Sequence, residues 1–170
     1  MNNEGPLAKM IRLWALFGGA LLLVIVLLTA INVAGFTANA IARLWGGNFP
    51  GLSGYEDAVT LFVGVAGLSF FPYCQLTNGH AAVDVFMEKA PVWANRFIAV
   101  LSAGLVVILA LYLSYMLVQG TLQIRADGIE TPVLGWPVWI FLPSAVISCL
   151  LWALAAASQF VTHVRGVDGI

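Results

Sequence analysis

Four long stretches of the sequence contain no charged side chain, and this spacing of charges constrains the fold more than any other feature. The stretches cover residues 13–42, 58–79, 97–124 and 131–164. Each reaches the roughly 20 apolar residues that an α-helix needs to cross the hydrocarbon core of a bilayer. A lone charge at mid-membrane costs on the order of 3 kcal/mol, so such long gaps between charges are informative. The pattern predicts four membrane-spanning helices.

The composition agrees with this interpretation. Hydrophobic residues make up 61% of the chain and charged residues only 9%, whereas a soluble domain usually carries about 25% charged residues. A membrane β-barrel needs segments that alternate apolar and polar residues, but stretches such as 21–28 are apolar throughout. We therefore expect an all-α integral membrane protein, a single domain over residues 1–170. Its predicted spans cover residues 13–36, 57–78, 97–122 and 137–162.

The distribution of basic residues predicts the orientation. Four spans place both termini on one side of the membrane. That side also holds the loop between the second and third spans, and it carries Lys9, Arg12, Lys89, Arg96 and Arg165. The opposite side carries only Arg43 and Arg125. Because Lys and Arg are enriched in cytoplasmic loops, we expect both termini in the cytoplasm.

Residues 80–90 are too polar to span the membrane and too apolar for a free loop. His80, Asp84 and Glu88 fall at helical spacing on one face, and Pro91 follows. This pattern is typical of a short amphipathic helix in the cytoplasmic interface. The same three side chains have the types that ligate metals, but no further ligands accompany them, so the solvated helix face is the favoured interpretation.

The predicted spans offer little chemistry. They contain no ionisable group at mid-membrane, where an ion-coupled carrier or multidrug exporter would hold its ion or proton. The only histidines, His80 and His163, fall at helix ends, whereas a haem-b subunit needs histidines that face each other. Cys74 and Cys149 form no CxxC pair and no metal-ligand spacing. We expect no enzyme activity, no cofactor beyond bound structural lipids, no metal site and no nucleic-acid partner.

Small residues follow one face of the second span, at Thr60, Gly64 and Gly67. Small-xxx-small pairs also occur at Ala15 with Gly19 and at Ser144 with Ser148. Small residues let helices approach closely, which drives helix association in lipid. Two interpretations stay open: packing within the four-helix unit, which we favour, and contact with a partner subunit.

The segment from Gly79 to Asp84 (Gly-His-Ala-Ala-Val-Asp), placed between the second and third spans, resembles a motif of the small membrane subunit of tripartite ATP-independent periplasmic (TRAP) transporters. Other features fall in the family's order: Asn32-Val33 late in the first span, Gly54, Glu56 and Asp57 at the start of the second, and Thr131-Pro132 before the fourth. The resemblance covers essentially the whole chain. Residues 75–78 lack the basic residue that often precedes the Gly-His pair in the family.

The resemblance implies a subunit of a sodium-coupled importer of organic acids in the bacterial inner membrane. In such an importer, a periplasmic binding protein captures the substrate and a large elevator-type membrane subunit carries it inward. The small subunit supports the large one and helps to dock the binding protein. The residues that the resemblance marks as structural or interface positions are Asn32, Glu56, Asp57, Gly79, His80 and Asp84.

Two other functions remain compatible with the residues themselves. The chain has the features of an accessory four-helix subunit of another membrane complex. A self-sufficient channel or membrane enzyme fits less well, because no buried charge or substrate-sized polar cluster is evident in the spans.

Overall fold

The structure is a computed structural model that describes residues 5–47, 51, 53–77 and 92–165. Within these ranges it is all-helical. Its elements are α1 (Pro6–Arg43), α2 (Tyr55–Leu76), α4 (Val92–Ala126), the short 3-10 helix η1 (Val138–Ile140) and α5 (Leu142–Arg165). Four helical segments are long and apolar enough to cross a membrane. The predicted fold class is thereby confirmed, whereas the predicted interfacial helix at residues 80–90 lies outside the described residues.

Helix α1 is much longer than the predicted span at residues 13–36. It has 38 residues, with Pro6 in its first turn, and ends at Arg43 before a turn in which Gly46 adopts a φ of 76°. At 1.5 Å per residue the helix is about 57 Å long, roughly twice the thickness of the hydrocarbon core. Nothing in the sequence interrupts the helix at residue 36. Because of its length, α1 either is strongly tilted from the membrane normal or extends beyond the hydrocarbon core.

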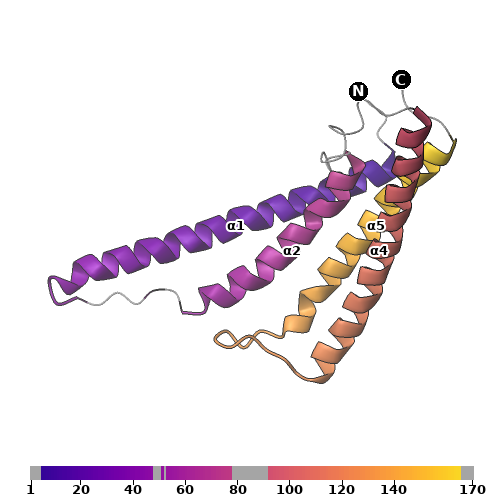
Figure 1. Ribbon diagram of the computed structural model, residues 1–170. Coiled ribbons are helices and arrows are strands. Elements are labelled where there is room, and N and C mark those ends of the chain that lie inside the picture. The colour runs from indigo at the N-terminus through magenta and orange to yellow at the C-terminus, as the bar shows by residue number, and fades with distance from the viewer. Residues whose placement is uncertain (1–4, 48–50, 52, 78–91, 166–170) are drawn as a thin grey trace.

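The four long helices form a single row rather than a closed bundle. Helix α1 packs against α2, α2 packs against α5, and α5 packs against α4, while α1 and α5 meet over only a small area. In Figure 1, α1 and α2 form one arm and α4 and α5 the other, and the arms diverge from the end at which the chain termini lie. A row has two broad faces, and many large apolar side chains are exposed on them.

The core lies where the arms meet. One buried cluster joins Ile11 of α1 to Leu151 and Ala155 of α5. A second joins Ala110 of α4 to Trp152 and Ala153 of α5. Helix α5 therefore supplies more of the core than any other described helix, which agrees with its position in the interior of the row. Burial of the first cluster holds the two arms together at one end, and burial of the second holds α4 against α5 within one arm.

Helix α5 begins at Leu142, later than the predicted start of the fourth span at residue 137. Residues 127–141 instead form an ordered loop in which Glu130 and Pro137 make an isolated antiparallel bridge. The N–H of Val138 donates to the carbonyl of Ile129 at 3.2 Å. Pro137 has an extended backbone, with φ −69° and ψ 115°, which keeps it out of the helix.

Candidate functional site

The carboxylate of Asp57 joins the start of α2 to the loop before α5. The backbone N–H groups of Val133 and Leu134 donate to one oxygen of Asp57 at 2.8 and 2.9 Å. Hydrogen bonds to an ionised acceptor are roughly twice as strong as those between neutral groups. The neighbouring Glu56 is exposed. The structure thus brings together two segments, the helix start and the loop, that the sequence marked separately.

The loop that binds Asp57 is ordered by its own turn. Thr131 is only 8% exposed. Its hydroxyl accepts the N–H of Trp136 at 3.0 Å, and its own N–H donates to the carbonyl of Trp136 at 2.9 Å. Gly135 supplies the positive φ of 64° that the turn requires. Two consecutive backbone N–H groups are thereby presented to Asp57.

Gly54 allows the loop to approach α2 this closely. It is the N-cap of α2 and adopts a φ of 83°. A Cβ at this position would lie 2.8 Å from Cδ2 of Leu134 and 3.2 Å from Cγ1 of Val133. Both the backbone conformation and the space therefore require glycine. The contact is a second attachment of the loop, beside that of Asp57.

The small-residue face of α2 points away from the other described helices. Gly64 and Gly67 are exposed, and a Cβ added at either would meet no atom within 4 Å. Thr60 is also exposed, and its hydroxyl donates to the carbonyl of Glu56 in the same helix at 2.8 Å. Packing of this face within the four-helix unit is the favoured interpretation of the sequence, but the described helices leave the face open.

The close approach between α1 and α2 occurs instead at Gly18. A Cβ there would lie 2.7 Å from Cβ of Ser69 and 3.2 Å from the carbonyl oxygen of Ala66. A Cβ at Gly19, which the small-xxx-small pattern had suggested, would meet open space. The sequence offers the Gly18-Gly19 doublet as a signal but does not show which glycine faces the neighbour.

A polar cluster at the C-terminal end of α2 was not found from the sequence. The Nε2 group of Gln75 donates to Oε1 of Gln159 at 2.6 Å, and the indole N–H of Trp152 donates to Oε1 of Gln75 at 3.1 Å. Gln159 in turn donates to the backbone carbonyl of Gln75. Gln75 is 7% exposed. Since buried amides need partners in lipid as in a protein core, this cluster fixes α2 against α5.

The remaining predicted site residues fall in different places. Asn32 is 1% exposed, and its side-chain oxygen lies 3.3 Å from the position that a Cβ on Gly51 would occupy. It therefore lies where α1 meets the segment that leads to α2. Gly79, His80 and Asp84 lie outside the described residues, so their predicted structural role stays a prediction.

The described residues contain no group of three or more His, Cys, Asp or Glu side chains placed to hold a metal ion. Their buried polar side chains are all neutral: Asn32, Ser69, Gln75, Ser114, Thr131 and Ser148.

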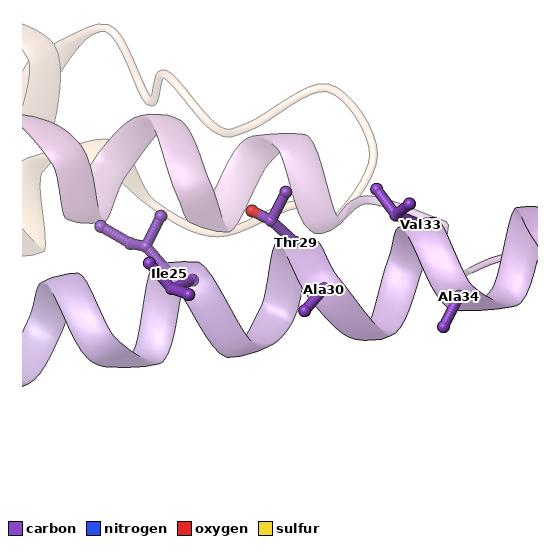
Figure 2. Close-up of a pocket in the computed structure, with 6 residues that line it drawn as sticks. Ile25, Thr29, Ala30, Val33 and Ala34 are labelled. Carbon is purple, nitrogen blue, oxygen red and sulfur yellow. The ribbon is translucent and has the colours of Figure 1, made fainter.

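An open and almost wholly apolar groove of about 580 Å³ lies along α1. Figure 2 shows side chains that line it. Thr29 contributes the only side-chain oxygen among the residues that line it. Such a surface offers shape and apolar contact rather than a group for acid–base or nucleophilic chemistry.

Comparison with known proteins identifies the family. The model of the family described as "Tripartite ATP-independent periplasmic transporters, DctQ component" matches residues 32–166. Searches of curated proteins and of solved structures gave no match. The matched range contains α2, α4, α5, the Asp57 contact and the glutamine cluster. The chain therefore belongs to the DctQ family, the small membrane component of TRAP transporters.

Proposed function

We propose that this chain is the scaffold subunit of a sodium-coupled importer of organic acids in the bacterial inner membrane. It supports the large elevator-type membrane subunit and helps the periplasmic binding protein to dock. Membership of the DctQ family supports a place in a tripartite transporter. The neutrality of the buried polar side chains among the described residues supports a role in assembly rather than in ion binding.

The observation that carries the proposal is the open face of α2. Thr60, Gly64 and Gly67 line a helix surface that no other described helix covers. In lipid, helices gain little from the hydrophobic effect and associate through close van der Waals contact, which small residues permit. A helix of the large subunit that packs on this face would approach the α2 backbone closely. We therefore place the main contact with the large subunit here.

The loop at residues 127–141 is the surface that we assign to docking of the binding protein. It lies at the outer end of α2 and α5 when the termini are cytoplasmic, as the distribution of basic residues favours. Asp57 and Gly54 hold it in one conformation against α2. A surface that is ordered before binding loses less conformational entropy when a partner docks.

The orientation is tested with single cysteines in a variant without Cys74 and Cys149. Asp127→Cys should react with a membrane-impermeant thiol reagent added to intact cells, whereas Gly5→Cys should react only after the membrane is permeabilised. Both positions are exposed. The reverse labelling pattern would show that the termini are periplasmic.

The function is tested by reconstitution. Liposomes that contain this chain, the large subunit and the binding protein should take up an organic acid when a sodium gradient is imposed. Omission of this chain should abolish uptake, and this chain alone should transport nothing. Sodium-driven uptake by this chain alone, or undiminished uptake in its absence, would overturn the proposal.

A further inference from the structure

The two arms of the molecule are connected in different ways at the end where they meet and at the end where they are apart. At one end the arms are joined by the apolar core and by the cluster of Gln75, Gln159 and Trp152. From there α2 and α5 diverge (Figure 1). The loop at residues 127–141, which connects the end of α4 to the start of α5, reaches the start of α2. We call this loop the strap, because it spans the open end between the arms.

The strap is attached to the first arm by three contacts. In one of them the ring of Phe141 lies against that of Phe62 of α2, with centroids 6.1 Å apart. The other two involve Asp57 and Gly54. The Asp57 carboxylate accepts the N–H groups of Val133 and Leu134 at 2.8 and 2.9 Å. The side chain of Leu134 also lies so close to Gly54 that no Cβ fits between them. Asp57 is the only charged group among the described residues that form this attachment. Its two hydrogen bonds are directional, which fixes both the position and the orientation of the strap.

The strap is also attached to the second arm. The guanidinium carbon of Arg125, at the end of α4, lies 4.8 Å from the ring centroid of Trp139, and this geometry is a cation–π contact. Within the strap itself, the ring of Trp136 stacks on that of Phe141, with centroids 6.2 Å apart. The hydrogen bonds of the turn around Thr131 shorten and stiffen the strap between its contact with Asp57 and its contact with Arg125. The strap therefore has little conformational freedom.

Helix α2, helix α5 and the strap therefore form a triangle. Its corners are the glutamine cluster, the Asp57 contact and the junction of the strap with α5, and all three are fixed. We infer that the Asp57–strap contact sets the angle between the two arms, so that the isolated chain is a rigid frame before any partner binds. Without this contact the arms stay joined at the glutamine cluster but vary their angle. The inference concerns the chain by itself and does not depend on the partners proposed above.

The test is a distance measurement by pulsed electron–electron double resonance on the full chain in lipid nanodiscs. Cys74 and Cys149 are replaced by alanine. One pair of spin labels is placed at the exposed residues Val63 of α2 and Leu122 of α4, towards the open end. A second pair, at Tyr73 and Val161, reports the joined end, where both residues are also exposed.

The parent should give one narrow distance distribution for each pair. Asp57→Ala should broaden the Val63–Leu122 distribution at least about twofold and leave the Tyr73–Val161 distribution unchanged. Asp57→Asn retains a weaker, uncharged acceptor and should broaden it less. Glu56→Ala removes the adjacent exposed carboxylate and should change neither distribution, which makes it the matched control.

Three outcomes would overturn the inference. The first is an unchanged Val63–Leu122 distribution in both Asp57 variants. The second is equal broadening at both ends, which would show a general loss of packing rather than a free angle. The third is the same broadening in Glu56→Ala, which would assign the effect to charge at the helix start and not to the strap.

Discussion

The indole N–H of Trp14 donates a hydrogen bond of 2.9 Å to the hydroxyl of Ser148, although the two residues are 134 positions apart in the chain. Ser148 is 1% exposed, and its own hydroxyl donates to the carbonyl of Ser144. The bond joins α1 directly to α5, past α2, which lies between them in the row. It therefore contributes to the corner at which the two arms meet.

Trp14→Phe should destabilise the chain by about 1 kcal/mol, because it removes this hydrogen bond but keeps an aromatic ring. The free energy of unfolding, measured by SDS titration in mixed micelles, is the appropriate quantity. Trp45→Phe is the control, since Trp45 is 87% exposed at the end of α1. Equal stability of Trp14→Phe and the parent would show that the bond contributes nothing.

Gly18→Val should destabilise the contact between α1 and α2 by about 1–3 kcal/mol, since a Cβ at Gly18 would lie 2.7 Å from Cβ of Ser69. Gly19→Val adds the same atoms where a Cβ meets open space and should be nearly neutral. Thermal unfolding in detergent compares the two variants. If Gly19→Val were the more harmful of the two, α1 would be rotated relative to the structure described here.

The glutamine cluster predicts non-additive substitutions. Gln75→Leu removes the donor to Oε1 of Gln159 and the acceptor of the Trp152 indole N–H, while the bond from Gln159 to the backbone carbonyl at position 75 remains. Because the loss of these side-chain bonds affects buried polar groups, the substitution costs more than the hydrogen bonds themselves contribute. Gln75→Leu combined with Gln159→Leu should cost less than the sum of the single substitutions, by about 0.5–2 kcal/mol. A double-mutant cycle of unfolding free energies measures this difference. Strict additivity would mean that the two amides do not interact.

The helices were predictable because the bilayer imposes a strong rule on the sequence. A segment that crosses it excludes charge over some 20 residues, and the four gaps between charges revealed this directly. Gly54, which the family resemblance marks at the start of the second span, adopts a positive φ that glycine takes readily. Helix α1 extends beyond the predicted span at residues 13–36, because the end of a membrane span and the end of a helix need not coincide.

The arrangement of the helices was less predictable, for a related reason. In lipid, both the packed and the exposed faces of a helix are apolar, so α1 shows no periodicity that separates Gly18 from Gly19. The partners of Asp57 are backbone N–H groups, which every non-proline residue carries and no sequence pattern marks. The amides of Gln75 and Gln159 were an available signal, because polar side chains in otherwise apolar helices tend to hydrogen-bond to each other.

The open face of α2 gives the central prediction. Gly64→Leu combined with Gly67→Leu should leave the isolated chain as stable as the parent, because neither Cβ meets another atom within 4 Å. The added side chains should nevertheless prevent a helix of the large subunit from approaching α2. Gly120→Leu is the matched control on α4, where a Cβ also meets open space.

Co-purification of a tagged large subunit in mild detergent, normalised to the membrane level of each variant, tests the scaffold account most directly. We predict at least about a tenfold loss of complex for Gly64→Leu with Gly67→Leu, and parental yield for Gly120→Leu. Parental yield for the double variant would contradict the assignment of the α2 face to the large subunit. If no variant of this chain, nor the parent, retained the large subunit, the scaffold function itself would be refuted.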